Sequence, residues 1–140
     1  MSKEDAVAFP IPVINEINAP YWESLRHQQL SFQKCAACDN KWLPARTECP
    51  RCLSPEIRWV AASGDARLIS WVVYRKAFHP NFADRLPYNV AVVELNEGPR
   101  LISNIVDLEG LNELAIEMPL QLVVRDEHGV AIPAFRKANT

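Results

Sequence analysis

All four cysteines of the chain lie within 18 positions, as two Cys-x-x-Cys pairs separated by ten residues. Two residues between thiols allow one tight turn to direct both sulfurs at one point, and the ten-residue excursion is long enough for a hairpin that returns the second pair to the same ion. Four thiolates suit zinc or rubredoxin-type iron. We therefore expect a structural metal site, with zinc as its ion, formed by Cys35, Cys38, Cys49 and Cys52.

The alternative chemistry for a Cys-x-x-Cys pair is thiol redox exchange. A redox pair requires a helix N-terminus that lowers the thiol pKa, and Pro44 and Pro50 disfavour a helix here. Four sulfur ligands leave no coordination position for substrate or water, and a segment of about 25 residues buries too little apolar area to fold by itself. The metal is predicted to hold the fold and not to catalyse. The residues after each second cysteine, Asp39 and Leu53, are expected in a left-handed or turn conformation.

A second group of chemically useful residues lies in the segment RKAFHPNFADRLP, residues 75–87. Loops of about 12 residues without secondary structure are usually functional or mobile. Its basic residues can pair with phosphates and its aromatic residues can stack on a base, which suits a nucleotide, either of a cofactor or of a single strand. A solvent-exposed lid with two phenylalanines beneath it is the alternative, and composition does not separate the two. The candidate ligand-binding residues are Arg75, Lys76, Phe78, His79, Phe82 and Arg85.

Catalytic motifs of the common hydrolase and nucleotide-binding types are absent, with no GxSxG, HExxH or glycine-rich phosphate loop. Of the three histidines, His79 is the only candidate for acid or base chemistry, and a surface histidine is the simpler interpretation. Asp107 and Glu109 are two residues apart, a spacing that does not place them face to face on a helix. The sequence predicts a protein that is not an enzyme by itself.

Composition and charge narrow the class of protein. The 140 residues are 49% hydrophobic and 23% charged, as in a globular chain, and no apolar run reaches the length of about 18 residues that a membrane span needs. The first ten residues, MSKEDAVAFP, lack the apolar core of a signal peptide, so we expect a cytoplasmic protein. A nucleic-acid binder normally has a basic excess, whereas the net charge here is −2. No nucleic-acid partner is therefore expected.

The elements that must position these residues follow from periodicity and turn residues. Residues 1–19 are interpreted as an extended apolar arm, followed by a short helix with Asn18 as cap and Pro20 in its first turn. After the cysteine segment, β-branched and aromatic runs indicate five strands, with helical spacing between the third and fourth. The expected strands are 66–74, 88–95, 100–106, 119–125 and 130–135, and the helical link is 107–118.

This order predicts a mainly β protein with an N-terminal helix, a rubredoxin-like zinc ribbon and a five-stranded OB-fold barrel, with a β-sandwich as the alternative to the barrel. The proposed division is an arm and helix over residues 1–34, a ribbon over 35–59 and an OB-fold domain over 60–140.

The whole pattern resembles the acyl-CoA-associated zinc-ribbon/OB-fold proteins, long catalogued as a domain of unknown function. The resemblance covers residues 18–136. One departure is Asp39, where the family tends to have glycine. The stretches that carry the resemblance are APYWESLRHQQLSFQKC, LPARTECPRC, ASGDARLISW, AFHPNF, YNVAVVELNEGPRLISNIVD and MPLQLVVRDEHGVAIPAFR.

The resemblance implies an accessory subunit of CoA-thioester enzymes in lipid metabolism. Its expected partners are thiolase-like, lipid-transfer-type or hydroxymethylglutaryl-CoA-synthase-like enzymes, or hydratases, and its barrel is expected to lie over the partner's acyl-CoA channel or to hold the CoA moiety. The leading hypothesis is a non-catalytic subunit that covers or binds acyl-CoA. The alternatives are a single-stranded nucleic-acid-binding module and a small CoA-thioester hydrolase that uses His79.

Overall fold

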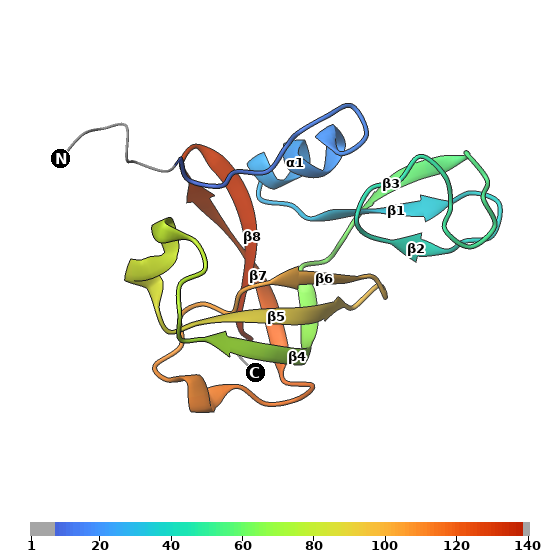
Figure 1. Ribbon diagram of the computed structural model, residues 1–140. Coiled ribbons are helices and arrows are strands. Elements are labelled where there is room, and N and C mark those ends of the chain that lie inside the picture. The colour runs from blue at the N-terminus through green and yellow to red at the C-terminus, as the bar shows by residue number, and fades with distance from the viewer. Residues whose placement is uncertain (1–7, 139–140) are drawn as a thin grey trace.

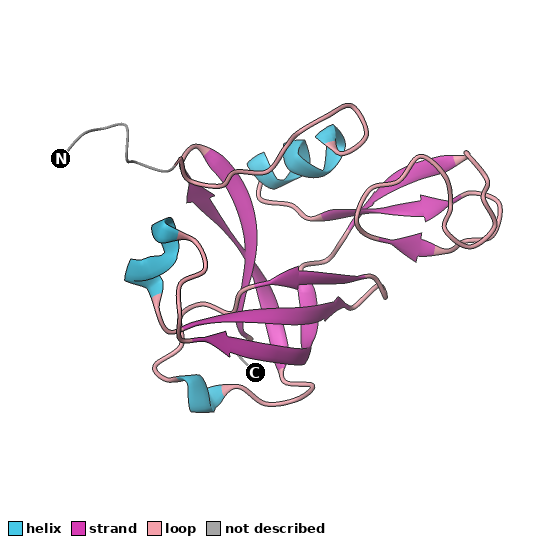
Figure 2. Cartoon of the chain, in the orientation of Figure 1, coloured by secondary structure: helices cyan, strands magenta, loops and turns pink. Residues whose placement is uncertain are grey.

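The computed structural model describes residues 8–138, which form two antiparallel sheets, one α-helix and two 3-10 turns (Figures 1 and 2). The N-terminal half contains α1 (Ala19–Arg26), β1 (Ser31–Cys35), β2 (Lys41–Trp42) and β3 (Ile57–Ala61). The C-terminal half contains β4 (Asp65–Tyr74), η2 (Pro80–Arg85), β5 (Tyr88–Leu95), β6 (Arg100–Ser103), η3 (Leu111–Glu113), β7 (Pro119–Glu127) and β8 (Val130–Lys137).

Pro20 lies in the first turn of helix α1, as predicted. The first N–H groups of a helix have no acceptor within the helix, so proline loses no hydrogen bond at this position. Asn18 occupies the N-cap position, but its side chain does not cap the helix. It accepts a hydrogen bond from the Asn15 N–H at 2.8 Å and donates one to the Val13 carbonyl at 3.0 Å. The cap residue therefore ties the N-terminal arm to the helix.

The three-stranded ribbon sheet has the order β2-β1-β3 and projects away from the larger sheet (Figure 1). Its interior is small, with Cys35, Trp42 and Cys49 buried. Gln33 is also buried, and its side-chain oxygen accepts hydrogen bonds from the Trp42 indole at 2.8 Å and from the Arg46 N–H at 2.6 Å. A polar residue thus takes a position that an apolar residue would fill in a larger core.

The five-stranded sheet has the order β6-β5-β4-β7-β8 and curls into a half-barrel. A bulge between Leu68 and Ser70 bends β4, which pairs with β7 only through its first three residues but with β5 along its length. An isolated parallel bridge between Ile105 and Phe135 joins the chain after β6 to β8. The strand order and this contact confirm the predicted OB-fold.

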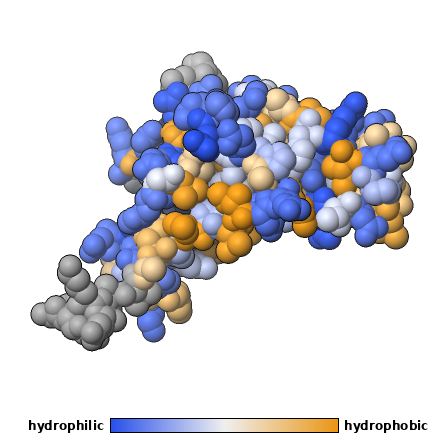
Figure 3. All heavy atoms as spheres, turned by 90° about the horizontal axis from the view of Figure 1, so that it is seen from above, coloured by the Kyte–Doolittle hydropathy of each residue, from blue (hydrophilic) through white to orange (hydrophobic). Residues whose placement is uncertain are grey.

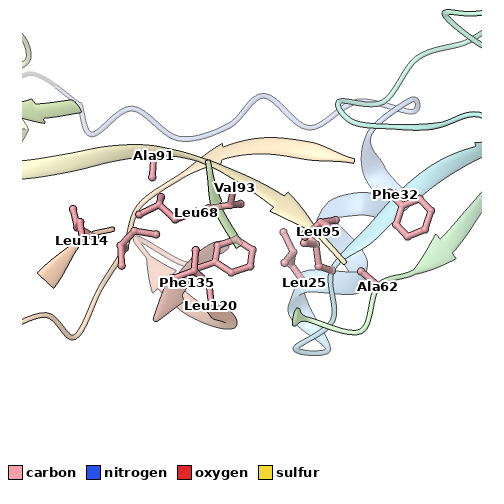
Figure 4. Close-up of a cluster of buried hydrophobic side chains, with 12 residues drawn as sticks. Leu25, Phe32, Ala62, Leu68, Ala91, Val93, Leu95, Leu114, Leu120 and Phe135 are labelled. Carbon is pink, nitrogen blue, oxygen red and sulfur yellow. The ribbon is translucent and has the colours of Figure 1, made fainter. Parts of the chain in front are cut away.

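One apolar core runs through both halves of the chain. Figure 4 shows Phe32 and Ala62 at one end, Ala91 and Leu114 at the other, and Phe135 between them. The helix and the base of β1 therefore pack onto the half-barrel, not on the ribbon alone. The fully buried side chains of this core include Leu25, Leu30, Leu68, Val93 and Phe135.

The predicted helix over residues 107–118 is wrong. The segment forms only the turn η3, and Asp107 and Glu117 have φ values of 57° and 65°, which a right-handed helix does not allow. Its leucines, spaced three apart, still pack on the core, so the spacing reflects burial against the half-barrel and not a helix.

Several further boundaries differ from expectation. Strand β4 begins one residue earlier than predicted, and β7 and β8 each end two residues later. The third strand of the half-barrel ends at Ser103 instead of residue 106, because the chain leaves β6 to reach the bridge at Ile105. The segment 75–87, expected to lack secondary structure, contains η2. None of the helices described has the length and apolar character needed to cross a bilayer.

Candidate functional site

The four cysteine sulfurs converge as the spacing predicts. All four lie within 4.8 Å of one another, with Sγ–Sγ distances of 3.5 Å between Cys35 and Cys52 and 3.6 Å between Cys38 and Cys49. A tetrahedral zinc site with bonds of about 2.3 Å separates its sulfurs by about 3.8 Å. The sulfurs are thus arranged as a closed four-thiolate site requires.

The two cysteine turns have the same backbone hydrogen bonds. In the first, the Asp39 N–H donates to the Cys35 carbonyl at 3.0 Å, and the Cys35 N–H donates to the Asn40 carbonyl at 2.8 Å. The second turn repeats the first bond between Leu53 and Cys49 at 2.9 Å. Asp39 and Leu53 have φ values of 63° and 65°, which confirms the predicted left-handed positions.

Backbone N–H groups also point at the metal ligands. Cys49 Sγ accepts hydrogen bonds from the N–H groups of Arg51 at 3.3 Å and Cys52 at 3.4 Å, and the Asn40 amide lies 3.7 Å away. Burial opposes ionisation of Cys49, but hydrogen bonds from the Cys52 and Arg51 N–H groups, together with the Asn40 amide and Cys38, outweigh it and lower the pKa of this thiol to about 6. These N–H groups favour the thiolate form of Cys49, whereas the neighbouring sulfurs and burial raise the pKa values of Cys38 and Cys52.

The loop 75–87 divides into an exposed part and an anchored part. Arg75, Lys76 and Phe78 are exposed, and the Phe78 ring is 77% accessible to solvent. Phe78 packs edge-on against Tyr74 at 5.9 Å between centroids, and Lys76 Nζ lies 5.7 Å from the centre of the Phe78 ring. Two cations and an aromatic ring therefore face solvent at the end of β4.

His79 lies where the anchored part begins. It is the N-cap of η2, and its Nδ1 accepts a hydrogen bond from the Asn81 N–H at 3.2 Å. This bond gives the histidine a structural role at the start of the turn. Phe82 lies 5.7 Å from the His79 ring and 5.7 Å from Tyr88, so both loop aromatics of the anchored part face other rings.

Arg85 is held at the end of η2 by partners distant in sequence. Its guanidinium donates two hydrogen bonds to the Glu127 carboxylate, at 2.8 and 3.0 Å. It also lies over the rings of Phe9, at 5.0 Å, and Phe82, at 5.3 Å. Hydrogen bonding to Glu127 raises the pKa of Arg85, and the same bonds lower the pKa of Glu127. Phe9 stacks on His128 at 4.1 Å, which ties the arm to the β7–β8 turn.

The six predicted ligand residues are therefore not one cluster. A chain of ring contacts joins only the phenylalanines of the two parts, from Phe78 through Tyr74 and Tyr88 to Phe82. Only the exposed part offers cations that no carboxylate engages in the described chain.

Sequence reasoning missed a cavity of about 1080 Å³ beside the anchored part. It lies between the arm, η2, the start of β5, the segment after β6 and the β7–β8 hairpin, and its lining includes Phe82 and Arg85 from the predicted ligand set. Arg125 and Glu127 contribute to its wall, and their spacing of two residues places both on one face of β7. Two charged residues on one face of a strand were the only sign of this cavity in the sequence. Its other walls could not be predicted, because they come from parts of the chain far apart in sequence.

Two family profiles match the chain in succession. Residues 22–58 match the rubredoxin-like zinc ribbon domain of ChsH2, and residues 59–125 match the C-terminal OB-fold domain of ChsH2. A solved structure named "Ltp2-ChsH2(DUF35) aldolase" superposes with a TM-score of 0.80 at 35% identity, covering 91% of this chain and 98% of that one.

The chain belongs to the ChsH2 (DUF35) family.

Other members of the ChsH2 family have informative names. A probable enoyl-CoA hydratase alpha subunit from Thermomonospora curvata is 36% identical over 92% of this chain. The matched region is only 40% of the length of that relative. A DUF35 domain-containing scaffold protein from Pyrococcus furiosus is 29% identical over 83% of this chain and 88% of the relative. A DUF35 structure from Sulfolobus solfataricus, with a TM-score of 0.60 at 16% identity, shares the fold.

Proposed function

We propose that this chain is a non-catalytic accessory subunit that docks on a thiolase-like or related CoA-thioester enzyme and covers or binds its acyl-CoA. The observation that carries the proposal is the likeness, over nearly the whole of the solved chain, to the ChsH2(DUF35) part of an aldolase named together with Ltp2. Scaffold proteins and a probable enoyl-CoA hydratase subunit among the relatives support the same role.

Exposed apolar residues support a docking role. On the outer face of the half-barrel, Val72 of β4 is 53% exposed and Ile102 of β6 is 72% exposed, and Phe78 lies in the loop that follows β4. The arm contributes a further group, which includes Val13 at 81% exposure. In the view onto the side of the molecule that carries the arm and α1, hydrophobic atoms gather between hydrophilic ones (Figure 3). Such apolar groups are typical of protein interfaces.

The exposed part of the loop is the proposed contact for the CoA phosphates. Arg75 and Lys76 have no carboxylate partner in the described chain, and Phe78 offers an aromatic face for the adenine. His79, Phe82 and Arg85 complete the proposed site by fixing the turn that follows. Because Arg85 already binds Glu127, it supports the loop and adds positive charge without offering a free pair of N–H groups.

The metal has a structural part in this function. The donor set fits zinc, which when bound supplies the free energy that the small ribbon interior lacks. The ribbon is then a rigid projection beside the half-barrel and not a site of chemistry.

Two experiments test the proposal. Affinity purification of the tagged protein from its own cells, with mass spectrometry, should recover a CoA-thioester enzyme. Calorimetry with CoA on that complex should then show about tenfold weaker binding for Arg75→Ala/Lys76→Ala, because a desolvated phosphate contact contributes roughly 1.5–3 kcal/mol. Lys41→Ala, which removes an exposed lysine of the ribbon, is the matched control. An intact complex whose CoA affinity does not change in the double variant would move the site elsewhere.

A further inference from the structure

The cavity beside the N-terminal arm has the size of a small-molecule site. Its volume of about 1080 Å³ lies just above the range of roughly 300–1000 Å³ found for ligand pockets. Arg75, Lys76 and Phe78 do not line it, although Phe82 and Arg85, which fix the turn beside them, do. The cavity therefore adjoins the surface proposed for the CoA phosphates but does not include its free cations. A ligand bound here would add a function to the accessory role.

Most of the cavity wall is apolar. The arm forms one side through Pro10, Ile11 and Pro12, and the opposite side includes Val106 and Ile132. Prolines fix the backbone of the arm, so this wall loses little conformational freedom when a ligand binds. The cavity therefore suits an apolar body.

The polar end of the cavity is built around Arg125. Its Nη2 donates a hydrogen bond to the Asn104 side-chain oxygen at 2.8 Å, and its Nη1 lies 3.6 Å from Glu127, too far for a good hydrogen bond. Its Nε is shielded from solvent and has no hydrogen-bond acceptor in the described chain. A guanidinium has five N–H donors, and within the described chain a single one of them makes a hydrogen bond. Arg125 is thus largely desolvated, at 31% side-chain exposure, with most of its donors uncommitted.

Asn104 is itself held in place, so the polar end is preorganised. Its side-chain amide donates to the Asn89 carbonyl at 2.5 Å, and the Asn89 side chain binds both the N–H and the carbonyl of Ile105. The oxygen of Asn104 is therefore left pointing at Arg125. A ligand would meet the guanidinium in a fixed position.

The charges around this end favour an anion. Arg85 and Arg125 carry two positive charges against the single carboxylate of Glu127, whose two oxygens already bind Arg85. Asp107 and Glu109 also line the cavity, but both are exposed and therefore screened by water. The inner end has a net positive charge that a carboxylate would balance.

We propose that this cavity binds a small molecule with an apolar body and a single carboxylate, the carboxylate pairing with Arg125 and the body lying between the arm and Ile132.

The test uses the full, metal-loaded chain and two probes that differ in one group, sodium decanoate and decanol. Calorimetry should show decanoate binding about tenfold tighter than decanol, because only the carboxylate makes a charge-assisted hydrogen bond. In NMR spectra, decanoate should shift the Nε–H signal of Arg125. Equal affinity for the two probes, or no binding of decanoate, would overturn the proposal.

Variants locate the site. Arg125→Met should weaken decanoate binding about tenfold, whereas Arg136→Met, which removes an exposed arginine from β8, should leave it unchanged. Ile132→Trp should abolish binding by filling the cavity, and Ile102→Trp on the outer face should not. The probe comparison on the unaltered chain decides the matter if Arg125→Met does not fold. Equal decanoate affinity of the two arginine variants would contradict the assignment to Arg125. The variant Arg75→Ala/Lys76→Ala alters only the proposed CoA surface, so a loss of decanoate binding in it would also contradict the assignment.

Discussion

The ribbon tip and the half-barrel differ in what their interiors contain. In the ribbon tip, the buried cluster is Cys35, Trp42 and Cys49, of which two are metal ligands. The core of the half-barrel has twelve buried residues, all apolar, and it includes Phe32 from the base of the ribbon. We therefore expect the tip to depend on a bound metal, whereas the half-barrel depends on apolar burial, which stabilises by about 25 cal/mol per Å².

The region that we expect to depend on the metal does not include the whole ribbon. Leu30 and Phe32 belong to the larger core, so the base of β1 is anchored without the metal. The metal-dependent region begins at about Cys35, where the first ligand lies.

Removing the metal should have the largest effect. We expect one zinc per chain by metal analysis, and chelation should unfold the segment between Cys35 and Ile57 while Val93 and Phe135 keep protected amides in NMR spectra. Structural zinc in small domains contributes an apparent binding free energy of about 10–16 kcal/mol, which the ribbon interior cannot replace. Freshly purified protein with a folded ribbon and neither zinc nor iron would contradict this prediction.

A core substitution should affect the half-barrel and leave the metal site intact. Phe135→Ala should lower the unfolding free energy by about 3–5 kcal/mol, because the ring is fully buried. Phe78→Ala, at an exposed ring, should change it by less than about 0.5 kcal/mol. Urea unfolding of the metal-saturated proteins measures both, and metal analysis should show equal zinc content. Similar losses in the two variants would show that the core is not as described.

Acid should weaken the half-barrel through its ion pairs. Hydrogen bonds from Arg85 lower the pKa of Glu127 in the folded protein. The stabilisation that ionised Glu127 contributes is therefore complete above the pKa of glutamate in the unfolded chain, about 4.3. It is lost as the pH falls from there through the lower pKa of the folded state. Glu127→Gln should cost about 1–2 kcal/mol at neutral pH and flatten the acid dependence of the unfolding free energy.

Glu48→Gln, at an exposed residue of the ribbon, is the matched control for the acid series. Its unfolding curves should follow those of the unaltered chain at every pH. An acid dependence that Glu127→Gln leaves unchanged would assign the effect to other carboxylates.

The smallest expected effect is a gain in the stability of the metal-bound ribbon. Leu53 is 67% exposed and has a φ of 65°, a left-handed conformation that is unfavourable for leucine. Leu53→Gly should stabilise the metal-bound ribbon by about 0.5 kcal/mol, after the greater flexibility of glycine in the unfolded chain is subtracted. Slower zinc transfer to a chelator measures the gain. Asp39→Gly should gain less, because aspartate tolerates this conformation better, and faster transfer from Leu53→Gly would contradict the argument.

The sequence by itself determined the parts of the protein whose interactions are local. The metal site could be predicted because two residues between cysteines restrict the geometry of one turn, and the same turn places Asp39 and Leu53 in left-handed conformations. Strand β5 was predicted at its observed bounds because alternate residues face the core. The OB-fold followed from the order of such strands.

Only the tertiary structure decided what depends on distant contacts. The leucines of residues 107–118 satisfy helical spacing but pack on the core from an irregular segment, since the core can bury them without a helix. Arg85 could be recognised as a cation, but its partner Glu127 lies 42 residues away, and that contact turns a proposed free phosphate ligand into an anchor. The uncommitted N–H groups of Arg125 and the cavity beside it arise in the same way, because they depend on five segments that only the folded chain brings together.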